Sequence, residues 1–157
     1  MAMGDPGRRV LGLDVGLRRV GVAISDPLGL TAQGLDTLER TNLRQDLARL
    51  SALAKQHGVE LIIVGHPLHL SGKQGRQAEL IQQFASKLAE RSGLPVQLWD
   101  ERLTTLVANQ VLRESGLSRQ KRARAVDRLS AVLILQSYLD SQSSGGLRGP
   151  QRWLDGC

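Results

Sequence analysis

The sequence predicts an α/β protein with a mixed five-stranded sheet, in which three antiparallel strands precede two parallel ones and helices flank the sheet. Two short apolar runs lie close together near the start of the chain, and each later strand-like run follows a stretch with helical spacing. The length of 157 residues suits one domain with a full core. We expect residues 9–140 to form that domain, with an N-terminal extension over 1–8 and a flexible tail over 141–157.

The first two strands flank a basic turn. The apolar runs Val10–Leu13 and Val20–Ile24 predict a hairpin of buried strands, and Leu30–Leu38 predicts a weaker third strand. The later predicted elements are a helix capped by Thr41 or Asn42 and stopped by Gly58, a strand over Leu61–Val64, a helix over Ala78–Leu88 stopped by Gly93, a strand over Pro95–Trp99, a short helix from Thr104 or Thr105 through Leu112, and a last helix from Ser118 to about Asp140.

Composition limits the class of protein. Apolar residues make up 41% of the chain and charged residues 23%, which is ordinary for a globular protein. No run approaches the ~18 apolar residues of a membrane helix. The N-terminus carries no hydrophobic stretch of the signal-peptide kind, so we expect a cytoplasmic protein without a membrane partner. Cys157 is the lone cysteine, which excludes an internal disulfide.

A net charge of +6 favours a polyanionic partner, above all nucleic acid, although a basic solvated surface would give the same charge. Only 3% of the residues are aromatic, which argues against a base-stacking platform and favours contacts to phosphate. The candidate phosphate ligands are Arg18, Arg19, Arg102, Lys121, Arg122 and Arg124.

Three acidic residues follow or border predicted strands and helices at compatible positions. Asp14 ends the first strand, Glu101 follows the last one, and Asp127 borders the apolar stripe of the last helix. Ligands gather at the carboxyl ends of parallel strands, and converging carboxylates repel one another unless a divalent cation joins them. Oxygen ligands favour Mg²⁺ or Mn²⁺, which can activate water for phosphodiester hydrolysis.

Each acid also has a plainer interpretation. Asp14 could cap its own turn, because Asp before Gly often bonds its own backbone. Glu101 could pair with Arg102 or a surface lysine. Asp127 could pair with Arg124, one turn earlier on the same helix.

Four motifs resemble the YqgF/RuvX family in the same order along residues 9–140: LGLDVGLRRVGVAISDP, VGHPLHLSG, WDERLTT and the VD…ILQSYLD helix. These are ribonuclease H-like proteins described as Holliday junction resolvases and as nucleases that mature the 5′ end of pre-16S ribosomal RNA. The resemblance implies a ribonuclease H-like fold and a nuclease whose catalytic, metal-binding acids are Asp14, Glu101 and Asp127. It implies Mg²⁺ or Mn²⁺, in a two-metal-ion mechanism, as cofactor.

The partner implied is structured RNA or a four-way DNA junction, and the RNA role ranks first because the family supports it better. Resolving a junction needs two symmetrical cuts and hence a two-fold dimer, so the chain is expected as a monomer or a homodimer.

One residue departs from the family's motif, and one choice between two possible metal ligands is not decided by the sequence. His66 stands before the proline where the family commonly carries an aliphatic residue or Asn, and with His69 it suggests a metal ligand. We expect a hydrogen-bonding loop histidine instead. Asp100 adjoins Glu101, and because successive strand residues point to opposite faces, only one should reach the metal. The family favours Glu101.

Two other classes of function remain as alternatives. Asp-x-Gly after a strand also occurs in the phosphate loop of sugar kinases and actin-like ATPases, but those proteins bind ATP between two related domains, and this chain has no second Asp-x-Gly hairpin. A non-catalytic RNA-binding ribosome assembly factor could keep the fold without cutting.

Overall fold

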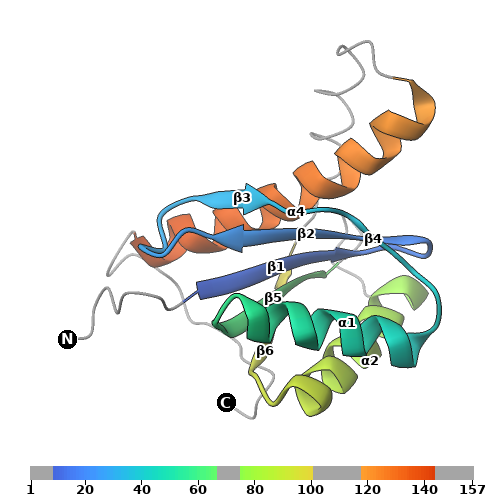
Figure 1. Ribbon diagram of the computed structural model, residues 1–157, viewed down its shortest axis with the longest axis horizontal. Coiled ribbons are helices and arrows are strands. Elements are labelled where there is room, and N and C mark those ends of the chain that lie inside the picture. The colour runs from blue at the N-terminus through green and yellow to red at the C-terminus, as the bar shows by residue number, and fades with distance from the viewer. Residues whose placement is uncertain (1–8, 67–74, 101–117, 144–157) are drawn as a thin grey trace.

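The computed structural model describes residues 9–66, 75–100 and 118–143, which form one mixed sheet with helices on both faces (Figure 1). The strands are β1 (Arg9–Val15), β2 (Arg19–Ser25), β3 (Ala32–Gly34), β4 (Leu38–Glu39), β5 (Val59–His66) and β6 (Val96–Asp100). Their order is β3-β2-β1-β5-β6, with β4 also paired to β2. The pairs within β1 to β4 are antiparallel, whereas β1-β5 and β5-β6 are parallel. The predicted α/β class and mixed sheet are confirmed.

The single third strand predicted over Leu30–Leu38 is wrong in detail, because this segment forms the two short strands β3 and β4. Arg128 accounts for the break. Its side-chain carbons lie over Gly34, and its guanidinium donates to the Leu35 carbonyl at 3.1 Å and pairs with Asp36 at 3.3 Å. The Leu35 amide still donates to the Val22 carbonyl of β2 at 2.8 Å, and regular pairing resumes only at Leu38, giving six strands where five were predicted.

Each described helix begins or ends at a capping residue that the sequence predicts. Helix α1 (Leu43–Gln56) begins at Asn42, whose side-chain oxygen accepts from the Gln45 amide at 2.9 Å. Helix α2 (Arg76–Ser92) stops at Gly93, which adopts a left-handed φ of 73°. Helix α4 (Arg119–Ser143) follows Ser118, whose hydroxyl accepts from the Lys121 amide at 3.3 Å. The short helix predicted through Leu112 lies outside the described residues.

Alternation along the strands divides the core into two clusters. Leu11, Leu13 and Val15 of β1 pack toward α1 and α2, while Gly12 and Asp14 lie on the face covered by α4 (Figure 1). The cluster under α4 includes Ala23, Ile63, Ala131, Ile134 and Leu135. Within the described ranges, no helix is both long enough and apolar enough to cross a membrane.

Candidate active site

Asp14 is brought beside α4 by a glycine on the neighbouring strand. It pairs across the hairpin with Gly21, so both positions lie on the same face of the sheet. A Cβ added to Gly21 would overlap the backbone carbonyl of Asp127, which shows that α4 packs directly on β2 at this point. The absence of a side chain at Gly21 therefore lets Asp127 approach Asp14.

The electrostatics show that the two carboxyl groups interact. Burial, and next the negative charge of Asp127, raise the pKa of Asp14 from its ordinary value of 3.8 to about 7. The Ser130 hydroxyl on α4 acts in the opposite direction and lowers this pKa. Asp14 is therefore close to half-protonated at neutral pH, and a cation that binds there displaces a proton.

Arg19, at the start of β2, binds the second carboxylate. Its Nε donates to Asp127 Oδ2 at 2.6 Å, and both side chains are about three-quarters buried, with exposed fractions of 27% and 21%. This hydrogen bond is the main cause that raises the pKa of Arg19 above its usual range. The plainer interpretation of Asp127, a pairing with Arg124, does not hold, since Arg124 instead lies 3.5 Å from Glu39 in an exposed pair.

The third predicted acid, Glu101, and its neighbour Arg102 lie outside the described residues. Asp100 does lie within them, as the last residue of β6, opposite His66 of β5. Trp99 faces α4, where its indole donates to Ser137 at 3.1 Å and its ring packs edge-on against Tyr138. By alternation, Asp100 lies on the other face, away from Asp14.

His66 is not the hydrogen-bonding loop residue that the sequence predicts. The strand β5 continues through it, and its Nε2 atom is buried without a hydrogen-bond partner among the described residues. Burial lowers the pKa of His66, and the charge of Asp100 partly opposes this effect. Because His66 pairs with Asp100, it lies on the same face of the sheet as Asp100, away from Asp14. His69 lies outside the described residues.

The donor chemistry fits a divalent cation. Asp14 and Asp127 supply hard oxygen donors in a partly buried setting, and a cation would relieve their mutual repulsion. Arg19 already neutralises part of this charge, so an ion must share Asp127 with it or displace it. In the described ranges, no group of three His, Cys, Asp or Glu side chains could hold a metal.

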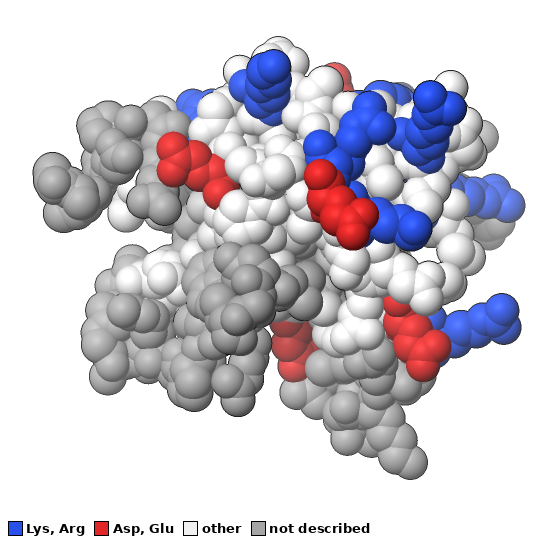
Figure 2. Space-filling view, turned by 90° about the horizontal axis from the view of Figure 1, so that it is seen from below, with Lys and Arg blue, Asp and Glu red and all other residues white. Residues whose placement is uncertain are grey.

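The cations predicted to bind phosphate are exposed wherever the structure describes their side chains away from the acids. Arg18, Lys121 and Arg124 are exposed, whereas the side chain of Arg122 is outside what the structure describes. On the face that carries α1 and α2, Lys and Arg side chains gather at the upper right of Figure 2. The role of these residues in phosphate binding stays a prediction.

Sequence reasoning missed the ion pair that anchors the hairpin turn. Asp46 in the first turn of α1 is fully buried and accepts from Arg40 Nε and the Thr41 amide, each at 3.0 Å. Arg40 also donates to the Gly16 carbonyl at 2.9 Å and lies over the Phe84 ring at 5.3 Å. An Arg-to-Asp spacing of six residues gave no signal of this pair. The contact fixes the turn next to Asp14 against α1.

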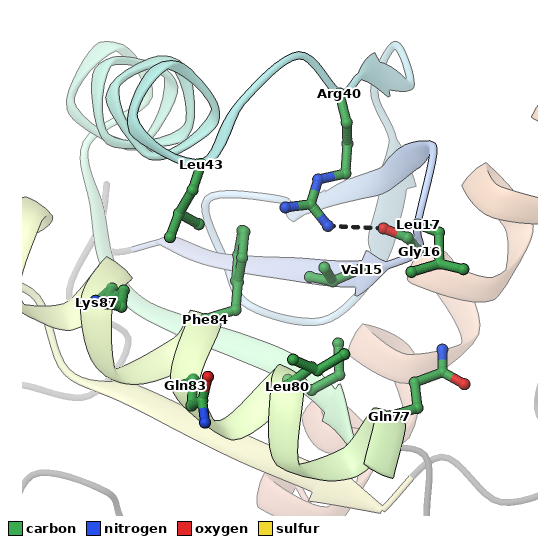
Figure 3. A pocket seen from close by; sticks show the side chains of 11 residues that line it. Val15, Gly16, Leu17, Arg40, Leu43, Gln77, Leu80, Gln83, Phe84 and Lys87 are labelled. Carbon is green, nitrogen blue, oxygen red and sulfur yellow. Dashed lines mark hydrogen bonds between the residues drawn. The ribbon is translucent and has the colours of Figure 1, made fainter.

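A pocket of about 260 Å³ opens beside the same turn (Figure 3). Val15, Phe84 and Arg40 line it, together with the exposed side chains of Leu17 and Leu80. Val15 and Phe84 belong to the core cluster under α1 and α2. The pocket therefore lies on the opposite face of the sheet from Asp14.

Comparison with known proteins identifies the family. A family model described as "RuvX: Holliday junction resolvase" matches residues 8–141. The chain belongs to the RuvX family. A relative from Koribacter versatilis is 54% identical over 132 residues, covering 84% of this chain and 86% of the relative, and one from Moorella thermoacetica is 50% identical over 139 residues, covering 88% and 99%. Both carry the name "Putative pre-16S rRNA nuclease".

Solved structures support the ribonuclease H-like fold of this RuvX family member. RuvC from T. thermophilus, in complex with a Holliday junction substrate, superposes with a TM-score of 0.58 at 14% identity, covering 94% of this chain and 99% of RuvC. The Fowlpox virus resolvase with junction DNA gives a TM-score of 0.54 at 13% identity, covering 85% and 98%. At such low identity the likeness concerns the fold alone.

Proposed function

We propose that this chain is a metal-dependent endonuclease that processes the 5′ end of pre-16S ribosomal RNA in the cytoplasm. The names of relatives at about half identity support the substrate. The observation that supports the chemistry is the placement of Asp14 beside Asp127 under α4, where burial, and next the negative charge of Asp127, raise the pKa of Asp14 to about 7. We assign the activity to residues 9–140, which nearly coincide with the family match.

In this proposal Asp14 and Asp127 are catalytic residues that hold a divalent cation, Mg²⁺ or Mn²⁺. Glu101 is the third acid, and it helps to position a second ion. When bound, such ions supply an activated water and stabilise the departing oxygen of a phosphodiester. Asp14 must lose its proton to bind, and the raised pKa makes that step dependent on pH near neutrality.

Arg19 has two roles in the same proposal. Without substrate it neutralises Asp127 through the 2.6 Å contact. If Asp127 held a cation instead, the Arg19 guanidinium would be free to bind the phosphate backbone, for which its planar donors are suited. Arg18, Arg102, Lys121, Arg122 and Arg124 add non-specific phosphate contacts around it.

A second candidate function is the resolution of four-way DNA junctions. The description of the family model favours it. A resolvase would need a homodimer that places two sites for symmetrical cuts, whereas RNA processing requires only a monomer. A non-catalytic RNA-binding assembly factor is the remaining alternative.

The experiment compares cleavage of a pre-16S ribosomal RNA fragment with cleavage of a four-way DNA junction. Wild type and Asp14→Asn are assayed with Mg²⁺, with Mn²⁺ and with a chelator. We expect the RNA to be cut only with metal and only by the wild type. Junction cutting alone would favour the resolvase. Tight RNA binding without cutting by either protein would overturn the nuclease proposal in favour of the assembly factor.

A further inference from the structure

The Ser130 hydroxyl is a buried polar group that the proposed chemistry has not used. Its residue is fully buried on α4, one turn after Asp127, and its Oγ has no hydrogen bond of regular geometry among the described residues. Buried hydroxyls are nearly always paired, so the burial of this one calls for a partner that packing alone does not supply.

The packing of α4 places this serine over Asp14. The Asp127 carbonyl meets Gly21, directly across from Asp14, and the Ala131 carbonyl lies 3.4 Å from where a Cβ of Gly12 would be. Gly12 and Asp14 lie two residues apart on the same face of β1. The helical turn from Asp127 to Ala131 thus covers Asp14, and its buried side chains are those of Ser130 and Ala131, of which only Ser130 is polar. The Ser130 hydroxyl lowers the pKa of Asp14, which agrees with this placement.

We propose that Ser130 is a positioning residue that holds the Asp14 carboxylate in the orientation needed to bind the cation. This inference rests on the proposed function, because it requires Asp14 to be a metal ligand. A hydroxyl suits the task because it is both a donor and an acceptor. It accepts from Asp14 while that group is protonated, and it donates to Asp14 once a cation has displaced the proton. Alanine could do neither.

The test measures Mn²⁺ affinity of the full chain by titration with electron paramagnetic resonance detection, without substrate. Groups that orient a metal ligand typically change affinity 10- to 100-fold when removed. We expect Ser130→Ala to weaken Mn²⁺ binding at least ~10-fold. The matched control is Ser137→Ala, two turns along α4, whose hydroxyl accepts from Trp99 and not from the acids. That variant should keep wild-type affinity.

A second readout separates positioning from packing. Ser130→Thr and Ser130→Val have nearly the same shape and differ by the hydroxyl. Threonine should retain Mn²⁺ affinity relative to valine, even if both variants lose some stability in the tight interior.

The possible outcomes distinguish this inference from the function on which it rests. Wild-type Mn²⁺ affinity in Ser130→Ala would overturn the role of Ser130 and leave the nuclease proposal standing. Equal affinities of the threonine and valine variants would also overturn it. Failure of the wild type itself to bind Mn²⁺ at millimolar concentration would overturn the metal site.

Discussion

Gly21 on β2 and Asp127 on α4 are in direct backbone contact, and this contact sets how closely the helix approaches the sheet beside Asp14. No side chain could stand at Gly21 without moving α4. The packing of one glycine therefore controls the separation of the two carboxylates from which the site is built.

Gly21→Ala should destabilise the protein and disturb the site together. The added methyl group meets backbone, which cannot rotate away, so we expect a loss of about 2–3 kcal/mol in the free energy of unfolding, typical of severe overpacking. Urea denaturation measures the loss. Gly34→Ala is the control, because its methyl would meet the flexible Arg128 side chain at 2.5 Å. A control as damaging as Gly21→Ala would contradict this account of the contact.

Asp14→Asn should make the stability of the metal-free protein depend less on pH. Because the folded-state pKa of Asp14 is raised, its protonation stabilises the fold fully below pH 3.8, and that contribution is lost as pH rises through about 7. Protonation of Asp14 contributes at most about 4 kcal/mol to the free energy of unfolding, since one pKa unit corresponds to ~1.36 kcal/mol. Thermal melting in chelator should show Asn more stable than Asp at pH 8, with little difference near pH 4. A less stable Asn variant at pH 8 would refute the raised pKa.

Arg19→Gln should lower stability without metal and increase the stabilisation that Mn²⁺ confers. Loss of the 2.6 Å bond leaves Asp127 facing Asp14 without its counter-charge, at a cost of about 1–2 kcal/mol, and it removes the competitor for the ion. Melting curves with and without Mn²⁺ measure both effects. The control Arg124→Gln breaks only an exposed pair and should change stability by less than ~1 kcal/mol. A smaller Mn²⁺ effect in Arg19→Gln than in wild type would show that Arg19 supports the ion instead of competing with it.

Binding of RNA should depend steeply on salt, and removal of exposed cations should reduce that dependence. Arg18→Gln and Lys121→Gln each remove one proposed phosphate contact. Each should lower the slope of log affinity against log salt by about 0.7–0.9. Fluorescence anisotropy with Asp14→Asn, which binds without cutting, gives the slopes. Unchanged slopes would exclude these residues from the interface.

Local sequence signals predicted most of the fold because they act over a few residues. Asn42 and Gly93 mark helix ends through their own side chain or backbone freedom, and the run Val10–Leu13 needs only its apolar character to be a buried strand. Asp14 and Asp127 stood out because carboxylates next to apolar stripes are costly to bury.

Contacts between distant residues could not be predicted in this way. The break between β3 and β4 depends on Arg128, more than ninety residues further along the chain. The pairing of Arg19 with Asp127 spans 108 residues, whereas the sequence offered Arg124 as the nearer partner. Ser130 gave no signal, because a serine on a helix is ordinary until the structure shows it buried over an acid.

The central claim is that ions held by Asp14 and Asp127 contact the phosphate that is cut. The most direct measurement replaces a non-bridging oxygen of that phosphate by sulfur and follows single-turnover cleavage of the RNA. Sulfur binds Mg²⁺ poorly and softer ions better. The account predicts that the substitution suppresses cleavage in Mg²⁺ and that Mn²⁺ or Cd²⁺ restores it in wild type but not in Asp14→Asn. Equal cleavage of both phosphate diastereomers and the unmodified RNA in Mg²⁺, or cleavage that persists in chelator, would contradict it.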